Sequence, residues 1–413
     1  MENNKTPSIR FKGFTDSWEQ RKLGDMGSTF TGLSGKTKED FGHGDAKFIT
    51  YMNVFSNSIA DLQMTETVEI DSKQNCVKAG DVFFTTSSET PEEVGMSCVM
   101  PENADNTYLN SFCFGYRPTE KFDLNYLAYV LRSESFRKEM TFLAQGISRY
   151  NISKNKVMEV EIPVPSLDEQ SKVGRYFSNL DNLITLHQRK YNKLLNVKKS
   201  MLEKMFPKNG SNIPEIRFKG FTDPWEQRKL EDYLTVSTEK NTDNIYGRSD
   251  VLSVSGDYGI VNQIEFQGRS FAGASVSNYG VVQTGDVVYT KSPLKSNPYG
   301  IIKTNKGKPG IVSTLYAVYH PKENVFSDFI QVYFEQHARM NNYMHPLVNK
   351  GAKNDMKVSA ENALKGPVYF PSHIEQESIS AFFSVLDNLI TLHQRELEKL
   401  QNIKKSMLEK MFV

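Results

Sequence analysis

The sequence predicts an α+β protein made of two tandem units, each consisting of a globular domain and a long helix. Three observations indicate this organisation. Two sequence blocks occur twice, the segments between them alternate strand-like and helix-like runs, and one repeated block places apolar residues every three or four positions. Because that spacing is typical of a coiled coil, we expect the two long helices to pair with each other.

The repeated blocks frame two dissimilar inserts. Leu180–Phe206 returns as Leu386–Phe412 with five changes, and Pro7–Leu23 returns as Pro214–Leu230 with two changes. The segments between these blocks share little sequence. Two matching frames therefore hold two different inserts, and a functional difference between the units must lie in the inserts.

Composition favours a protein of the cytosol. The 413 residues leave room for two domains, and a net charge of +1 gives no global signature of nucleic-acid binding. Three cysteines, all in the first insert, match neither a disulfide framework nor a zinc site, which is typical of a reducing compartment. The N-terminus lacks the apolar core of a signal peptide, and no apolar run reaches membrane-spanning length. We therefore expect a cytoplasmic protein that contacts polyanions through local patches.

Both inserts follow the same order of elements. In the first, we expect strands at Lys47–Phe55, Asp81–Thr86 and Ser111–Tyr116, a helix at Asn125–Gln145 and a strand at Val157–Val164. The second insert repeats the Gly-Asp-Val strand start, a helix and a polar loop with different residues. The inserts are therefore expected to share an α+β fold with divergent loops. The head block before each insert fits either a short capped helix or an extended segment.

The long repeated block predicts a helix with an apolar seam and a wider apolar stripe. The seam steps alternately by four and three residues, and about thirty helical residues span on the order of 45 Å. The wider stripe could bind helices of other chains or pack onto the protein's own inserts, and the sequence favours neither. The stripe consists of Leu183, Leu186, Val197 and Leu202 on the first helix and Leu389, Leu392, Ile403 and Leu408 on the second. The expected helix–helix interface consists of Val173, Phe177, Leu180, Ile184, Tyr191, Leu194, Met201, Met205, Ile379, Phe383, Leu386, Ile390, Leu397, Leu400, Met407 and Met411.

The chain shows no constellation typical of catalysis or of metal binding. Gly32–Thr37 is similar to a phosphate-binding loop, but Phe30 stands where that loop requires glycine. Asn297–Gly300 lacks the second proline of the Asn-Pro-Pro-Tyr motif of amino-methyltransferases and is more typical of a turn. His187 and His393 occupy equivalent seam positions, where single histidines are more often core polar groups than metal ligands. We therefore expect neither catalytic nor metal-binding residues, and no cofactor on this chain.

Polar and basic residues gather in loops at equivalent positions of both inserts. Lysine and arginine neutralise phosphates, whereas Asn, Ser, Thr and Arg hydrogen-bond to base edges. Charged loops are usually only solvated, but the repeat strengthens a DNA-binding interpretation, because these loops are where the inserts differ. In the first insert the candidate DNA-binding residues are Lys36, Lys38, Thr85, Thr86, Ser87, Ser88, Ser148, Arg149, Tyr150, Asn151 and Lys154. In the second insert they are Lys291, Ser292, Lys295, Asn297, Tyr299, Lys303, Lys306, Lys350, Lys353, Asn354 and Lys357.

The order and spacing of these blocks carry a family resemblance. The carriers are the duplicated Trp-Glu-Gln-Arg-Lys-Leu heads, the strands that begin at Gly80 and Gly285, the Pro-Ser and Glu-Gln pairs before both tails, and the repeated tail helices. Together they resemble the specificity subunits of type I restriction–modification systems over nearly the whole chain. The resemblance implies two target recognition domains and two spacer helices, paired as an antiparallel coiled coil with pseudo-twofold symmetry. The implied domains are residues 1–167 and 211–373, and the implied spacer helices are residues 168–210 and 374–413.

The resemblance also implies a function and partners. A member of this family recognises an asymmetric bipartite target in double-stranded DNA and docks two modification subunits, which methylate adenine with S-adenosylmethionine. Two restriction subunits, which use ATP and Mg, complete the enzyme, so the specificity subunit itself is expected to be non-catalytic. Duplex DNA has twofold axes perpendicular to its length, so two domains related by a twofold axis can face two half-sites. Half-sites on one face of the duplex lie about 34 Å apart. The alternatives are a coiled-coil scaffold that never touches DNA, a self-sufficient methyltransferase, and a degenerate subunit whose inserts recognise nothing.

Overall fold

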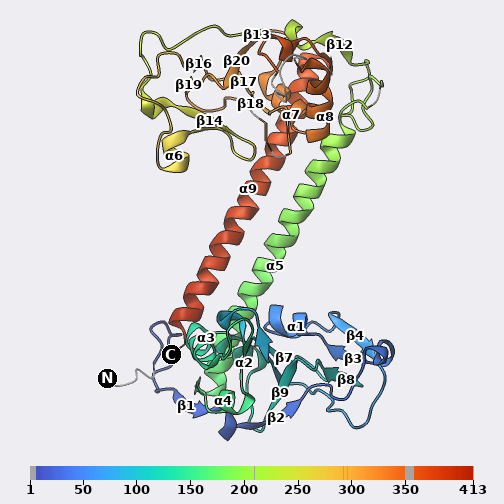
Figure 1. The fold of residues 1–413 in the computed structure, drawn as a ribbon, viewed down its shortest axis with the longest axis vertical. Helices are drawn as coiled ribbons and strands as arrows, with labels where there is room; N and C mark the ends of the chain where they lie inside the picture. Colours follow the sequence, from blue (N-terminus) through green and yellow to red (C-terminus); the bar gives the residue numbers. More distant parts are fainter. Residues whose placement is uncertain (1–5, 209, 292, 295, 349–357, 413) are drawn as a thin grey trace. The chain divides into compact units, whose positions relative to one another are not determined.

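The chain divides into two compact units, which Figure 1 shows with most of their helices and strands labelled. Unit 1 comprises Met1–Gln188 and Gln394–Val413, and unit 2 comprises Arg189–His393. Two 38-residue helices, α5 (Leu167–Lys204) and α9 (His373–Lys410), each begin in one unit and end in the other. The computed structural model describes residues 6–208, 210–291, 293–294, 296–348 and 358–412.

Both units contain the same four-stranded antiparallel sheet. The central strands keep the same register, because Val82 lies opposite Tyr116 in unit 1 and Val287 lies opposite Tyr319 in unit 2. The two Gly-Asp-Val sequences therefore start the central strand of one shared fold. In unit 1 the sheet runs in the order β2 (Gly27–Thr31), β9 (Cys113–Pro118), β5 (Val82–Thr85), β7 (Ser97–Val99). In unit 2 the order is β13 (Leu234–Val236), β20 (Tyr316–Pro321), β17 (Val287–Thr290), β18 (Ile302–Thr304).

A two-stranded sheet joins the two ends of each insert. β1 (Glu19–Lys22) pairs antiparallel with β11 (Glu161–Val164), and β12 (Glu226–Lys229) pairs antiparallel with β21 (Pro367–Phe370). The head block is thus extended where it meets the insert, which confirms the extended reading over the short helix. Each insert consequently leaves its frame and returns to it at one place.

Outside these shared sheets the two inserts differ. In unit 1 a three-stranded sheet includes one parallel pair, β3 with β8, whereas the paired strands of unit 2 are all antiparallel in the part of the chain that the structure describes. The further strands of unit 1 are β3 (Phe41–Ile49), β4 (Thr65–Val68), β6 (Ser87–Ser88), β8 (Thr107–Leu109) and β10 (Tyr150–Asn151). Those of unit 2 are β14 (Leu252–Ser255), β15 (Gly259–Asn262), β16 (Gly280–Val282) and β19 (Gly310–Val312). The short helices are α1 (Tyr51–Ser56), α2 (Leu124–Val130), α3 (Glu134–Leu143), α4 (Lys154–Met158), α6 (Gln263–Gln267), α7 (Ser327–Phe334) and α8 (His337–Met344).

Side-chain caps shorten several elements relative to the sequence-based prediction. The strand expected at Lys47–Phe55 is wrong beyond Ile49, because the Thr50 side chain accepts a hydrogen bond from the Asn53 N–H and starts α1. The helix expected at Asn125–Gln145 is two helices instead. Ser133 caps the second of them, α3, by accepting from the Phe136 N–H.

The last strand of the first insert is also shorter than expected. It begins at Glu161 rather than at Val157, because α4 occupies residues 154–158. Similarly, β9 begins at Cys113 rather than at Ser111, because the Cys113 N–H donates to the Asn110 carbonyl in a turn. Such local hydrogen bonds override apolar alternation over so few residues.

Aromatic cores lie where the end of one long helix meets the start of the other. In unit 1 the Phe412 ring stacks on Phe177 with 5.6 Å between centroids and lies 6.5 Å from the Trp18 ring. In unit 2 Phe206 makes the equivalent contacts, 5.8 Å from Trp225 and 6.2 Å from Phe383. Within each unit the helices therefore pack antiparallel, with the repeated tryptophan of the head block between them. Trp18 and Trp225 therefore anchor the head blocks in the cores of their units.

An ion pair repeats between helices in both units. In unit 1 Lys404 of α9 contacts Asp181 of α5 at 2.6 Å, and in unit 2 Lys198 of α5 contacts Asp387 of α9 at 2.5 Å. Every residue expected at the helix–helix interface is buried or half-buried. The wider stripe is divided: Val197, Leu202, Ile403 and Leu408 pack on the unit cores. Leu183, Leu186, Leu389 and Leu392 are exposed.

The Glu-Gln pair at the start of each long helix makes buried hydrogen bonds that connect the helix to the rest of its unit. The buried Glu169 carboxylate accepts two hydrogen bonds from Arg10 at 2.6 and 2.8 Å, and Glu375 accepts two from Arg217, both at 2.7 Å. The neighbouring Gln170 accepts from the Asp123 N–H and donates to the Pro165 carbonyl. These residues recur in both units because the frame, not the insert, requires them.

We expect Glu375→Ala to lower the free energy of unfolding of unit 2 by about 3 kcal/mol, because it leaves the Arg217 guanidinium largely buried and unpaired. Urea unfolding followed by tryptophan fluorescence measures the change, since Trp225 is the only tryptophan of unit 2. Glu226→Ala is the matched control in the same unit. It breaks a similarly short pair with Arg228 that lies on the surface, and we expect little change. Equal effects of both variants would contradict the prediction.

Candidate nucleic-acid interface

Backbone pairing brings two distant polar segments of the first insert together. Strand β6 pairs with β10, so that Ser88 lies opposite Tyr150 and Ser87 lies opposite Asn151. The Ile152 N–H then donates to the Thr86 carbonyl at 3.0 Å. The candidate residues at 85–88 and at 148–154 therefore form one surface, although some sixty residues separate them.

A tight loop presents the most exposed part of this surface. Gln145 and Asn151 exchange two backbone hydrogen bonds at 2.8 and 2.9 Å, which closes the loop. Gly146 has a φ of +146°, and a Cβ there would lie 2.0 Å from the Arg149 carbonyl oxygen, so only glycine fits. Ser148, Arg149, Asn151 and Lys154 are all exposed. The loop thus holds cationic and amide groups in a fixed arrangement.

Three of the candidate residues in the first insert point inward instead. Thr85 is fully buried and its hydroxyl accepts from the Met96 N–H. Ser87 and Ser88 are buried as well, and the Ser88 hydroxyl donates to Glu93. These side chains hold the surface in place rather than forming it.

A small hollow lies beside Thr86. Its volume is about 350 Å³, and the residues that line it include Ser34, Thr86, Ser111 and Lys154. The hydroxyls and the lysine make it polar on one side, whereas Cys113, Phe114 and Ile152 make it apolar on the other. Of the candidate residues, Thr86 and Lys154 meet here.

Lys36 and Lys38 differ in how accessible their ammonium groups are to a phosphate. Lys36 lies 3.1 Å from the Asp71 carboxylate and its side chain is only 12% exposed. The pKa of Asp71 is lowered to about 2 by hydrogen bonds from Gln74 and the Lys73 backbone and by Lys36, so the carboxylate stays charged. Lys38 is exposed. Of the two lysines, Lys38 is the one that can meet a phosphate without losing a partner.

The second insert places fewer of its candidate residues at the surface. Asn297 is buried and bonds to His337, and Lys303 is buried in β18, where burial lowers the pKa of its ammonium group. Lys306 is exposed and pairs with Asp328 at 3.1 Å. Lys291 and Tyr299 are half-buried. The candidates Ser292, Lys295, Lys350, Lys353, Asn354 and Lys357 lie outside the described residues.

One pair of surface residues escaped the sequence analysis. The Thr86 N–H donates to the Phe112 carbonyl, and the equivalent Lys291 N–H donates to the Leu315 carbonyl. Both turns expose their apolar side chain, by 58% at Phe112 and 59% at Leu315. The strand expected at Ser111–Tyr116 hid the first turn, nothing in the sequence indicated the second, and only the aligned positions of the inserts could have pointed to them.

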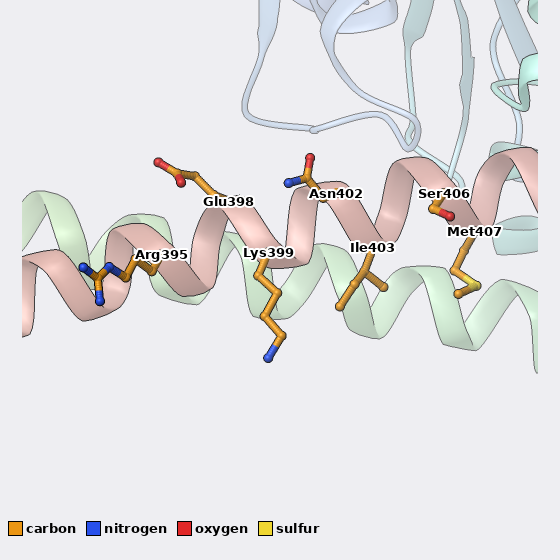
Figure 2. Close-up of a pocket in the computed structure, with 7 residues that line it drawn as sticks. All are labelled: Arg395, Glu398, Lys399, Asn402, Ile403, Ser406 and Met407. Carbon is orange, nitrogen blue, oxygen red and sulfur yellow. The ribbon is translucent and has the colours of Figure 1, made fainter. Parts of the chain in front are cut away.

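Equivalent hollows also lie on the two long helices. In unit 1 the hollow on α9 has a volume of about 520 Å³, and Figure 2 shows Lys399, Ile403 and Met407 projecting from one side of the helix there. In unit 2 the hollow on α5 has a volume of about 550 Å³. Seven residues line each, and they correspond one to one along the repeat: Arg189 with Arg395, Asn192 with Glu398, Lys193 with Lys399, Asn196 with Asn402, Val197 with Ile403, Ser200 with Ser406 and Met201 with Met407.

The described residues contain neither a cluster of metal ligands nor a membrane-spanning helix. No group of three or more His, Cys, Asp or Glu side chains is placed to hold a metal ion there. No helix in the same part of the chain is long and apolar enough to cross a membrane.

Comparisons with known proteins agree with these features. A family model described as the type I restriction modification DNA specificity domain matches residues 15–196. The MjaX type I restriction enzyme specificity subunit of Methanocaldococcus jannaschii, whose curated name marks that role as unproven, is 24% identical over 95% of this chain and 92% of its own. The MjaVIII specificity subunit of the same organism is 31% identical over 20% of each chain. A crystal structure of the type I restriction–modification S subunit from M. genitalium shares the fold, with a TM-score of 0.60 over 99% of both chains at 13% identity. Over nearly its whole length the chain is therefore similar to a type I restriction enzyme specificity subunit, residues 15–196 match the type I DNA specificity domain, and the fold is that of a solved S subunit.

Proposed function

We propose that this chain is the specificity subunit of a type I restriction–modification enzyme and that it recognises an asymmetric bipartite DNA target, with one half read by each insert. The observation that carries the proposal is the identical frame around different surfaces. Equivalent strand ends continue into Thr86 in one unit and into Lys291 in the other, and the exposed loops around them share little sequence. Because base edges are distinguished by the side chains that meet them, different surfaces select different half-sites.

The second part of the proposal concerns partners. Two modification subunits dock at equivalent positions, one on the helices of each unit. The matching hollows support this arrangement, as do exposed leucines at equivalent places, Leu183 with Leu389 and Leu186 with Leu392. Two restriction subunits then complete the enzyme. An exposed apolar surface of this kind is typical of a protein interface.

The chain's own role in this proposal is binding without chemistry. S-adenosylmethionine belongs to the modification subunits, and ATP and Mg belong to the restriction subunits. The chain holds its partners and the DNA in register and needs no resident cofactor. Its place of action is the cytoplasm, where the chromosome that carries the targets lies.

Mapping of methylated adenine tests the recognition proposal. Genomes of cells with and without this gene are compared, with the modification subunit present in both. We expect two different short sequences separated by a fixed gap to be methylated only when the gene is present. Identical methylation in both genomes would contradict the proposal and favour a scaffold that does not read DNA.

Docking is tested by placing a charge on the exposed leucines. We expect Leu186→Asp or Leu392→Asp alone to give complexes with one modification subunit, and the double variant to give none. Burying an aspartate in an apolar contact removes a hot spot of 2 kcal/mol or more, so affinity at each position should fall roughly 30-fold or further. Native mass spectrometry of the purified complexes counts the subunits.

The repeat itself supplies the control for this experiment. Leu195 is 39% exposed, but its equivalent in the other helix is Gln401, which is polar. A partner that binds both helices in the same way cannot depend on an apolar side chain at this position. Leu195→Asp should therefore leave two modification subunits bound, and loss of a subunit in this variant would count against equivalent docking.

A further inference from the structure

The turns that carry Phe112 and Leu315 are alike in backbone and in setting. The Cys113 N–H donates to the Asn110 carbonyl at 3.1 Å, and the Tyr316 N–H donates to the Ser313 carbonyl at 3.0 Å. Each turn leads into the strand paired with the central strand, β9 in unit 1 and β20 in unit 2. The two side chains thus occupy one equivalent position on two dissimilar inserts.

Single exposed apolar residues are normal on protein surfaces and need no explanation. A pair at one equivalent position is different, because the inserts share little other surface sequence. The Phe112 backbone is fixed on both sides: its N–H donates to the Asn110 side chain, and its carbonyl accepts from both the N–H and the hydroxyl of Thr86. The turn therefore holds the ring outward at a defined place instead of burying it.

The surroundings of both turns suit a polyanion. In unit 1 the residue before Phe112, Ser111, lines the same hollow as Thr86 and Lys154. In unit 2 the backbone partner of Leu315 is Lys291, whose pKa is lowered by burial and by the nearby Lys240, against the opposing effect of Glu361. Each apolar tip is thus flanked by groups that bind phosphates, which an apolar protein partner would leave unpaired.

We propose that Phe112 and Leu315 are wedges, each of which enters the base stack of its own half-site when the target is bound. The inference rests on the proposed function, because it assigns a contact within that DNA complex. Phenylalanine and leucine are side chains that proteins insert between base steps, where they unstack the bases and bend the duplex. The flanking hydroxyl and lysine groups then hold the displaced backbone.

The test uses the complex of the full chain with its modification subunit and the duplex that methylation mapping identifies. Duplexes carry 2-aminopurine at successive positions of each half-site, since its fluorescence rises when it unstacks. We expect the wild-type complex to raise the signal at one step in each half-site. Phe112→Ala should abolish the rise in the first half-site only, and Leu315→Ala in the second only. Each variant should bind the target on the order of tenfold more weakly, with unchanged affinity for random duplex.

Two exposed apolar residues at the starts of the long helices are matched controls, Leu167→Ala in unit 1 and Ile374→Ala in unit 2. Both should leave the fluorescence and the affinity unchanged. Unaltered fluorescence and affinity in Phe112→Ala and Leu315→Ala would overturn the wedges while the proposed function stands. Loss of a modification subunit from these variants would also overturn them, and would assign the turns to a protein contact. A wild-type complex that binds the mapped target no better than random duplex would overturn the proposed function and the wedges together.

Discussion

Replacing the second insert with a copy of the first should turn the asymmetric target into a palindrome. In this graft residues 24–179 take the place of residues 231–385. The frame can accept them, because β1 pairs with β11 as β12 pairs with β21, and Phe206 meets Trp225 as Phe412 meets Trp18. We expect methylation at two inverted copies of one half-site and none at the original target. Mapping of methylated adenine in cells that also make the modification subunit measures both.

The graft must extend past the insert into the long helix for a steric reason. A Cβ on Gly174 would lie 2.5 Å from the Asp123 carboxylate and 2.6 Å from the Tyr126 nitrogen. The equivalent position of α9 is Ser380, which is buried in its own unit. The first insert can therefore not sit on the second helix unless the glycine comes with it.

That glycine also supplies a control for the graft. In this control, serine replaces the copy of Gly174 that the graft brings into the second unit. This chain should fold poorly and methylate neither the palindrome nor the original target, because the hydroxymethyl group meets backbone that cannot move aside. A graft that folds and still methylates the original asymmetric target would show that the inserts do not select the half-sites.

The frame could be read from the sequence because its physical requirements are local and repeated. The spacing of Phe177, Leu180 and Leu386 predicts an apolar seam, and these side chains are buried in the structure. The head and tail blocks recur because each tryptophan ring and each Glu-Gln pair packs in an equivalent place in both units. A residue pattern that appears twice in one chain can be told from chance similarity without comparing other sequences.

The candidate site could be predicted only in part, because loop composition does not specify burial. Lys303 looks like a phosphate contact in sequence, yet it lies in β18 with its ammonium group near Glu335 and Asp387. Thr85 belongs to the same polar run as Thr86, but alternation along the strand turns its side chain inward. Which of two adjacent polar residues faces solvent depends on strand register, and register is set by distant partners such as Cys113.

The exposed turns were missed for the opposite reason. Phe112 and Leu315 are apolar, so their residue type predicts burial. Their exposure depends on hydrogen bonds from Thr86 and Lys291, which are more than twenty residues away in the chain. Sequence patterns describe neighbours along the chain well, whereas a turn held from outside can be recognised only in three dimensions.

Lengthening both long helices by four residues should widen the gap between the half-sites while leaving each half-site unchanged. The insertion duplicates Leu186–Arg189 in α5 and Leu392–Arg395 in α9, which have the same sequence. Four residues add about 6 Å and one turn plus roughly 40°, and a coiled-coil seam tolerates this step. Since a base pair adds about 3.4 Å and roughly 35°, both the added length and the added rotation correspond to one or two base pairs.

Methylation mapping should show the same two half-sites with the longer gap. As a control, four residues inserted after Glu102, an exposed loop position of unit 1, should leave the gap unchanged. An unchanged gap in the lengthened chain would mean that the helices do not set the spacing and that the recognition domains choose it themselves.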